Sequence, residues 1–121
     1  MTPPLCHRIA VHKIPDFWER LKHARAAFLA LDYDGTLAPF HTERMRALPL
    51  AGVPELLERI SAKTHGALAI VSGRPISEIE TLLPVEGITV IGAHGYEIKH
   101  PLAKIIRRLP SPKQLRGLEL A

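Results

Sequence analysis

Short apolar stretches alternate with longer amphipathic stretches along the middle of the chain. The apolar stretches, at residues 26–31, 67–71 and 88–91, have the length and composition of buried strands. Between them, residues 54–62 and 75–83 place apolar side chains at helical spacing and begin with a proline, which the first turn of a helix accepts. Strands that alternate with helices predict an α/β fold with a parallel sheet of about three strands and helices on both faces.

Less regular segments flank this region. Residues 15–22 predict a short helix, with acidic residues before basic ones. Residues 34–48 are expected to form a loop or flap, residues 96–99 a further short strand, and residues 102–109, whose apolar positions lie at helical spacing, a basic helix. The expected buried side chains of the first helix are Phe17, Trp18 and Leu21, and the apolar positions of the last are Leu102, Ile105, Ile106 and Leu109.

The chain is expected to divide into three parts: an N-terminal arm with the short helix at 1–25, a core at 26–98 and a basic tail at 99–121. The formal charge is +4, and residues 99–116 hold six of the 16 Lys and Arg residues and no acid. A basic tail can bind phosphate, nucleic acid or an anionic surface, and it can also be a plain solvated face. Because no aromatic residue is interleaved with the charges, we expect no nucleic-acid partner.

Several classes of protein are not expected. The single cysteine, Cys6, excludes an internal disulfide, and the spacing of the seven histidines predicts no zinc site. No stretch approaches the roughly 20 apolar residues of a membrane span, and the N-terminus lacks an apolar signal core. These features predict a soluble, cytoplasmic protein with no membrane partner; they say nothing of its oligomeric state.

Two aspartates follow the first predicted strand. Asp32 and Asp34 are two residues apart, so in an extended chain their side chains point to the same side. They lie at the carboxyl end of the strand, where open α/β sheets place active sites, and Gly35 allows a sharp turn there. Two carboxylates held close repel unless a cation such as Mg²⁺ binds between them or one holds a proton. Both conditions suit phosphoryl transfer, although an acidic glycine turn is the simpler alternative.

The second predicted strand also ends in a small polar residue and a glycine. Ser72 and Gly73 stand just before the helix at 75–83, where a hydroxyl and backbone N–H groups suit phosphate oxygens, and Arg74 adds a charged fork. Ser72 could equally be a plain helix cap. The third strand leads into Gly92-Ala93-His94-Gly95, in which His94 could contact substrate or simply bond to the backbone of the turn.

The first motif with its strand, ending in Thr36, closely resembles the Asp-x-Asp-x-Thr motif of the haloacid dehalogenase (HAD) superfamily of phosphatases. The wording Leu-Asp-Tyr-Asp-Gly-Thr-Leu-x-Pro, with Ser-Gly-Arg and Gly-x-His-Gly downstream, is similar to the trehalose-6-phosphate phosphatase branch. The resemblance covers residues 28–98 and implies the N-terminal part of a Rossmann-like HAD core.

The resemblance implies Mg²⁺-dependent hydrolysis of a sugar phosphate, most simply trehalose 6-phosphate. Asp32 would attack phosphorus and form an aspartyl-phosphate, and Asp34 would protonate the leaving oxygen and then activate water. Mg²⁺ would bind the Asp32 carboxylate and the Asp34 backbone carbonyl. The residues implied to bind the substrate or its phosphate are Thr36, Ser72, Gly73, Arg74 and His94.

The chain also departs from this family. Members use a downstream Lys and an acidic pair, with a cap domain that selects the sugar, whereas after Ile98 this chain has no Asp and only Glu119 as an acid. We therefore expect the cap and the later core strands to be absent, which would leave the strand at 26–31 as an exposed edge. The alternatives are a truncated phosphatase, a non-catalytic remnant or interaction module, and a phosphatase for sucrose phosphate or mannosylglycerate phosphate.

Overall fold

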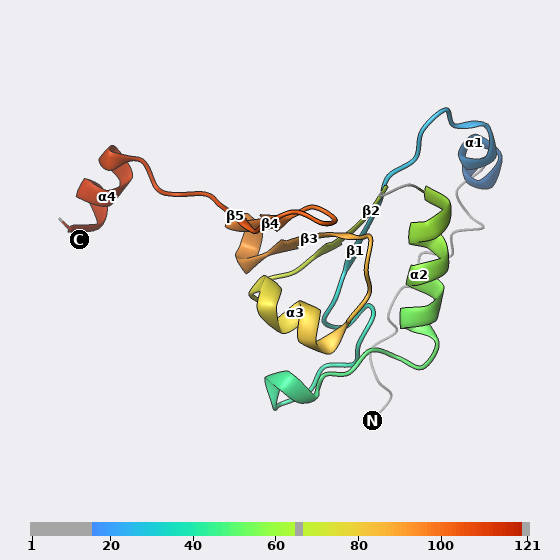
Figure 1. Cartoon of the computed structure of the whole chain (residues 1–121), viewed down its shortest axis with the longest axis horizontal. Helices are drawn as coiled ribbons and strands as arrows, with labels where there is room; N and C mark the ends of the chain where they lie inside the picture. Colours follow the sequence, from blue (N-terminus) through green and yellow to red (C-terminus); the bar gives the residue numbers. More distant parts are fainter. Residues whose placement is uncertain (1–15, 65–66, 120–121) are drawn as a thin grey trace, which may run out of the picture.

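The computed structural model describes residues 16–64 and 67–119, so the expectations for Cys6 and the arm before Asp16 lie outside the described residues. One five-stranded sheet forms the centre, in the order β1-β2-β3-β4-β5 (Figure 1). The strands are β1 (Leu29–Asp32), β2 (Leu68–Val71), β3 (Thr89–Gly92), β4 (Glu97–Lys99) and β5 (Ile106–Arg107).

The three parallel strands of the prediction are confirmed, and the sheet extends beyond them. β1 pairs with β2 and β2 with β3 in parallel, whereas β4 and β5 add an antiparallel hairpin beside β3. The helices are α1 (Phe17–His23), α2 (Val53–Thr64), α3 (Ile76–Leu82) and α4 (Pro112–Glu119), with short 3₁₀ turns η2 (Arg44–Arg46) and η3 (Ala93–Gly95).

The main helices α2 and α3 cover one face of the sheet. Leu57 of α2 and Ile79 of α3 share one buried cluster with Leu68 and Ile70. Leu68 and Ile70 are two apart in β2 and therefore point to the same face. Since β1, β2 and β3 follow one another in a single direction, right-handed crossovers place both connecting helices on that face.

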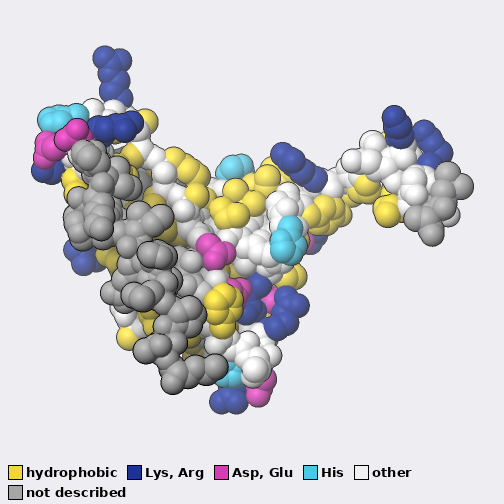
Figure 2. Space-filling model, turned by 180° about the vertical axis from the view of Figure 1, so that it is seen from behind, with side chains coloured by type: hydrophobic (Ala, Val, Ile, Leu, Met, Phe, Trp, Pro, Cys, Tyr) yellow, Lys and Arg dark blue, Asp and Glu magenta, His cyan; other side chains and the backbone are white. Residues whose placement is uncertain are grey.

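The predicted helix at 102–109 is wrong. Ile106 pairs with Ile98 across the hairpin, and Arg107 pairs with Glu97. Leu102 has φ 58°, which a right-handed helix does not allow, and its side chain is fully exposed. Cross-strand pairing therefore overrides the helical spacing, and a helix forms only after Pro110, as α4, which projects from the body (Figures 1 and 2).

The first helix forms as predicted, but its apolar side chains are not buried. Phe17, Trp18 and Leu21 are 37%, 56% and 44% exposed. Phe17 and Trp18 contact each other edge to face, with ring centroids 5.0 Å apart. In the described part of the chain, no helix has the length and apolarity that a membrane span requires.

Candidate active site

The carboxyl ends of β1, β2 and β3 lie together along the carboxyl-terminal edge of the sheet, which is distinct from its lateral edge at β1. Asp32 pairs with Val71 in register, and Val71 pairs with Ile91. The N–H of Ser72, the first residue after β2, donates to the carbonyl of Ile91 at 2.9 Å. The three segments singled out in the sequence therefore meet at the place where open α/β sheets carry their sites.

Asp32 presents an open carboxylate at this edge. Its side chain is exposed, and the Thr36 hydroxyl donates to its Oδ2 at 3.3 Å. Within residues 16–64 and 67–119, no Lys, Arg or His forms an ion pair with Asp32. Of the two aspartates, Asp32 has the more exposed carboxylate, and it is the one without an ion pair among the described residues.

Tyr33, between the aspartates, anchors the motif from the opposite side. Its side chain is fully buried, and its hydroxyl donates to the carbonyl of Ala47 at 2.6 Å. Burial raises the pKa of Tyr33, so it remains a neutral donor. The buried Tyr33 fits the expected alternation, in which Asp32 and Asp34 share the other side of the extended chain. Sequence reasoning overlooked Tyr33, although the same alternation marks it as an inward residue.

Asp34 is held by a buried arginine from the second motif. Arg74 Nε donates to Asp34 Oδ2 and Arg74 Nη2 to Asp34 Oδ1, both at 2.8 Å. Arg74 is only 7% exposed, whereas the Asp34 side chain is 29% exposed, so the guanidinium is shielded from water and the carboxylate is partly open to it. The hydrogen bonds from Arg74 hold the pKa of Asp34 below its usual range.

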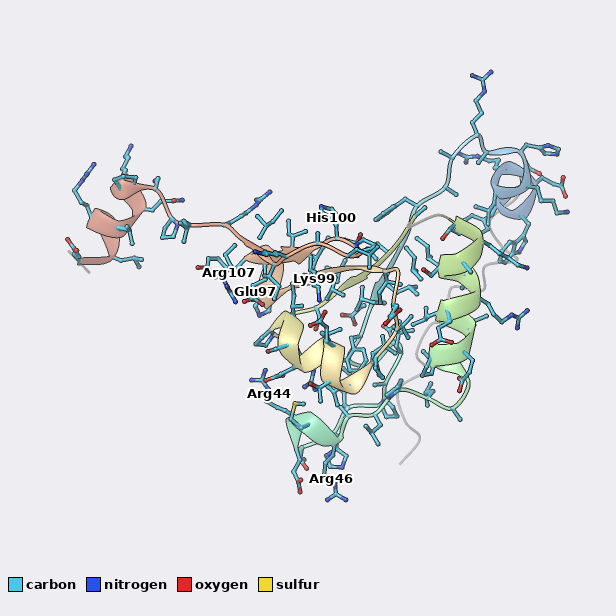
Figure 3. All side chains as sticks on the ribbon, viewed as in Figure 1. Arg44, Arg46, Glu97, Lys99, His100 and Arg107 are labelled. Carbon is cyan, nitrogen blue, oxygen red and sulfur yellow. The ribbon has the colours of Figure 1, made fainter. Side chains whose placement is uncertain are left out.

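The same arginine links the site to the loop before α2. Arg74 Nη1 also donates to Glu78 of α3 at 3.2 Å, and the same Glu78 oxygen accepts from Arg44 of η2 at 2.9 Å. Figure 3 shows Arg44 beside α3. The guanidinium of Arg74 lies 5.8 Å from the centre of the Tyr33 ring. Arg74 therefore faces carboxylates and an aromatic ring in this structure, and its expected contact with phosphate stays a prediction.

Ser72 shapes the turn after β2. The side chain is buried, and its hydroxyl oxygen accepts the N–H of Arg74 at 3.1 Å. It does not cap α3, whose first N–H, from Ile76, donates to Glu97 Oε2 at 3.0 Å. Because the Ser72 oxygen serves as an acceptor, the hydroxyl proton stays available as a donor toward a phosphate oxygen.

His94 lies directly over Gly73. A Cβ on Gly73 would stand 2.5 Å from His94 Cε1, so only glycine admits the ring in this position. His94 has φ 54°, and its N–H donates to the carbonyl of Ser72 at 3.3 Å. The second and third motifs are thus interlocked, and the imidazole is exposed at the same edge of the sheet as Asp32.

Glu97 is a structural residue that joins α3 to the β4–β5 hairpin. Besides the N–H of Ile76, it binds Arg107 of β5, whose Nε donates to Glu97 Oε1 at 3.1 Å (Figure 3). The backbone hydrogen bond from Ile76, and then Arg107, hold the pKa of Glu97 below its usual range. Ile76 is 21 positions away in the sequence, and Arg107 meets Glu97 only because β4 and β5 pair. No local pattern could therefore have revealed these contacts.

The described residues contain no group of three or more His, Cys, Asp or Glu side chains arranged to hold a metal ion. The first motif supplies two kinds of hard oxygen: the open carboxylate of Asp32 and the main-chain carbonyl of Asp34. Mg²⁺ in phosphoryl-transfer sites is commonly held by one or two protein oxygens together with waters and substrate phosphate. The residues present are therefore compatible with Mg²⁺, although the Asp34 carboxylate itself is bound to Arg74.

Comparison with solved structures supports the fold. The chain is similar to a trehalose-6-phosphate phosphatase related protein, with 29% identity and a TM-score of 0.61 over 78% of this chain and 39% of that one. It is also similar to a phosphatase of the HAD enzyme superfamily from Bacteroides thetaiotaomicron, with 25% identity and a TM-score of 0.54 over 78% and 34% of the two chains.

Sequence comparison points to the same family. A trehalose-phosphate phosphatase of Mycobacterium leprae is 35% identical over 78 residues, which make up 64% of this chain and 18% of that protein. The chain thus spans less than a fifth of the length of this relative, and 11% of the length of another. The family model of trehalose-phosphatases matches residues 30–118, from β1 into α4. The chain therefore belongs to the trehalose-phosphatase family and has the fold of the HAD superfamily.

Proposed function

We propose that this chain carries the nucleophile half of a sugar-phosphate phosphatase site, with trehalose 6-phosphate as the preferred substrate. The observation that carries the proposal is the open Asp32 carboxylate at the carboxyl end of β1, next to a second aspartate in a different charge environment. The family match and the HAD fold support phosphate-monoester hydrolysis as the type of reaction.

The proposed reaction has two steps. An oxygen of Asp32 attacks phosphorus, the bond between phosphorus and the sugar oxygen breaks, and the sugar leaves with a proton delivered by Asp34. Water then attacks the phosphorus of the aspartyl-phosphate, Asp34 accepts a proton from that water, and phosphate leaves as Asp32 is regenerated. The hydroxyls of Ser72 and Thr36 are proposed to hold phosphoryl oxygens.

The pair of Asp34 with Arg74 bears on this scheme. The low pKa of Asp34 favours its ionised form, which suits the water-activating step. The proton-donating step requires that the bond to Arg74 weaken as the substrate binds, and a phosphate that attracts the guanidinium would have this effect. Arg74 is thus proposed to donate to the substrate phosphate with one guanidinium nitrogen and to Asp34 with another. His94 and Gly73 are proposed to contact the substrate at the border of the site.

Mg²⁺ is the proposed cofactor, held by the Asp32 carboxylate and the Asp34 carbonyl. When bound, it would offset the repulsion between the attacking carboxylate and the phosphate oxygens. Residues 26–98 are proposed to form the catalytic part, and residues 1–25 and 99–121 an arm and a basic tail around it. We also propose a cytoplasmic location for the protein.

The test is phosphate release by the purified chain from trehalose 6-phosphate, sucrose 6-phosphate and mannosylglycerate phosphate, with and without Mg²⁺. In any active form that contains this segment, we expect the highest rate with trehalose 6-phosphate, loss of activity in excess EDTA and recovery when Mg²⁺ is restored. Persistent hydrolysis in excess chelator would contradict the mechanism, because the open Asp32 carboxylate and the phosphate oxygens repel each other unless a cation lies between them.

A non-catalytic interaction module is the second candidate, and one observation favours it. β1 is the edge of the described sheet, and Phe28 and Leu29 at this edge are 64% and 39% exposed. An apolar strand edge of this kind is a pairing surface for another polypeptide. A folded chain that binds neither phosphate nor Mg²⁺ would favour this candidate over the phosphatase.

A further inference from the structure

Phe40 is an exposed aromatic ring at the rim of the candidate site. Its side chain is 81% exposed, although it lies against the chain immediately after Asp34. A Cβ on Gly35 would stand 2.5 Å from Phe40 Cε2 and 2.6 Å from Phe40 Cζ. The ring therefore covers Gly35 and presents most of its surface to solvent beside the aspartates.

The backbone fixes the ring in this place. The N–H of Gly35 donates to the carbonyl of Ala38 at 2.7 Å, and the N–H of Ala38 donates to the carbonyl of Tyr33 at 3.1 Å. The chain thus folds back on itself directly after the first motif, and Phe40 follows this turn. Gly35, with φ 81°, provides both the left-handed backbone and the space under the ring.

The far end of the loop is tethered as well. The N–H of Leu50 donates to the carbonyl of Leu37 at 2.8 Å, and Tyr33 binds the carbonyl of Ala47. Arg44, between these points, is paired with Glu78 of α3. Phe40 therefore sits on a loop that is anchored on both sides of the site.

Packing does not account for this ring. A side chain that is 81% exposed gains little from burial, and a glycine offers few atoms for contact. Ligand sites combine apolar and aromatic walls with a few polar groups that fix orientation, and Phe40 would supply such a wall next to the polar groups of the first motif.

We propose that Phe40 is a specificity-determining residue that stacks against the less polar face of the sugar carried by the substrate. The C–H groups on that face are weakly positive, and the face of an aromatic ring is negative. With phosphorus at Asp32, a sugar bonded to the phosphate would extend over the chain that follows the motif, where Phe40 covers Gly35. The inference rests on the proposed function, since it places the sugar beside the phosphoryl site.

The test separates the sugar from the phosphate. Trehalose and inorganic phosphate, neither of which is turned over, are titrated separately into the full chain with Mg²⁺, and the phenylalanine ring signals are followed by NMR. The chain has three phenylalanines, so the Phe40 signals are assigned by their loss in Phe40→Leu. Phe40→Trp is the conservative variant, and Phe28→Leu is the matched control, because Phe28 is also exposed but precedes β1 at the other end of the strand.

We expect trehalose to shift the Phe40 ring signals, Phe40→Leu to weaken trehalose binding by about 3- to 10-fold, and Phe40→Trp to restore it. Phosphate affinity should be unchanged in both variants, and Phe28→Leu should alter neither affinity. The inference is overturned if trehalose leaves the Phe40 signals unmoved, or if Phe40→Leu weakens phosphate and trehalose binding equally. Trehalose binding without phosphate binding would overturn the proposed phosphoryl site while the sugar contact stands.

Discussion

Asp32 and Asp34 are two residues apart and have different surroundings. Asp32 is exposed and contacts the Thr36 hydroxyl, whereas Asp34 lies in the fork of a buried arginine that holds its pKa low. Environments that differ in this way give two chemically identical groups different roles. In the proposed reaction, the open carboxylate attacks phosphorus and the paired one transfers the proton next to it.

Asp32→Asn should abolish phosphate release, because an amide cannot form an acyl phosphate. Loss of a covalent nucleophile typically lowers kcat by several orders of magnitude. The measurement is kcat with trehalose 6-phosphate. Asp16→Asn is the matched control, since Asp16 is exposed and has φ 65°, a conformation that asparagine tolerates. Retention of more than about a tenth of the activity, roughly 1.4 kcal/mol of barrier, would exclude Asp32 as the nucleophile.

Arg74→Gln should destabilise the fold. Two carboxylates, from Asp34 and Glu78, would lose their common partner, the buried guanidinium of Arg74. Removal of one member of a buried pair costs about 3–5 kcal/mol, and partial solvent access to these carboxylates reduces the expected cost to about 1–3 kcal/mol. Urea unfolding measures it, with Arg46→Gln as the control, because Arg46 is 68% exposed in its pair with Glu43. Equal losses in unfolding free energy from the two substitutions would show that the Arg74 pairs stabilise the fold no more than an exposed ion pair does.

At the scale of elements, the site depends on tight turns after β2 and β3. Gly73 accommodates the ring of His94, and Gly92, the last residue of β3, lies against the backbone of the second motif. The neighbour of Gly73 is the end of a side chain, whereas the neighbour of Gly92 is main chain. Their different ability to move gives the two glycines different tolerance of a methyl group.

Gly73→Ala and Gly92→Ala should therefore differ. A Cβ on Gly92 would meet the carbonyl oxygen of Arg74 at 2.8 Å and the backbone nitrogen of Ile76 at 2.9 Å, so we expect a loss of about 2–3 kcal/mol in unfolding free energy. A Cβ on Gly73 pushes against the exposed ring of His94, which can swing outward at a cost below about 1 kcal/mol. Urea unfolding measures both, and the His94 ring signals should move only in Gly73→Ala. The opposite order of stabilities would contradict this packing.

Glu97 joins α3 to the β4–β5 hairpin, and this link should depend on pH. Its folded-state pKa lies below the ordinary 4.5 because the ionised form accepts the Ile76 N–H and pairs with Arg107. The stabilisation is therefore fully present above about pH 4.5 and is lost as the pH falls through the folded-state pKa. Glu97→Gln should have a lower Tm than the wild type at neutral pH.

The Tm difference between wild type and Glu97→Gln should narrow as the pH is lowered from 6 toward about 3. Protonation of Glu97 removes the same negative charge that the substitution removes. Thermal melting across this range is the measurement. Glu58→Gln, at an exposed position of α2, is the control and should give a difference that does not depend on pH. A Glu97→Gln difference that stays constant with pH would contradict the ionic link.

At the scale of the whole molecule, the sheet has an open apolar edge. Among residues 16–64 and 67–119, β1 pairs only with β2, and its exposed residues contrast with β2, where Leu68, Ala69 and Ile70 are fully buried. Figure 2 shows hydrophobic side chains on the surface of the body as well as on the projecting C-terminal arm. Unprotected strand edges favour association between chains.

The purified chain should therefore self-associate, and a charge at the edge should reduce this association. Phe28→Lys places a lysine where edge strands commonly carry one, and sedimentation velocity over a range of concentrations should show a larger monomer fraction. Leu118→Lys is the control, since Leu118 is 72% exposed on α4, away from β1. A wild-type chain that stays monomeric at all concentrations, or an equal response to both substitutions, would show that the β1 edge is not the contact.

The sequence by itself determined the strands β1 to β3, the helices between them and the family, because these depend on local periodicity and on short motifs. It also brought Asp32, Ser72 and His94 to one edge of the sheet, since parallel strands end together.

Only the tertiary structure decided the contacts between segments that are remote in sequence. Arg74 meets Asp34 across 40 positions, and Glu97 meets Ile76 across 21, distances that no periodicity encodes. The same cause explains the failed helix at 102–109: the local spacing favoured a helix, but pairing of Ile106 with Ile98 completed the hairpin. Local pattern fixes what a segment can form, and long-range hydrogen bonds and packing select among those forms because they satisfy more of its polar groups.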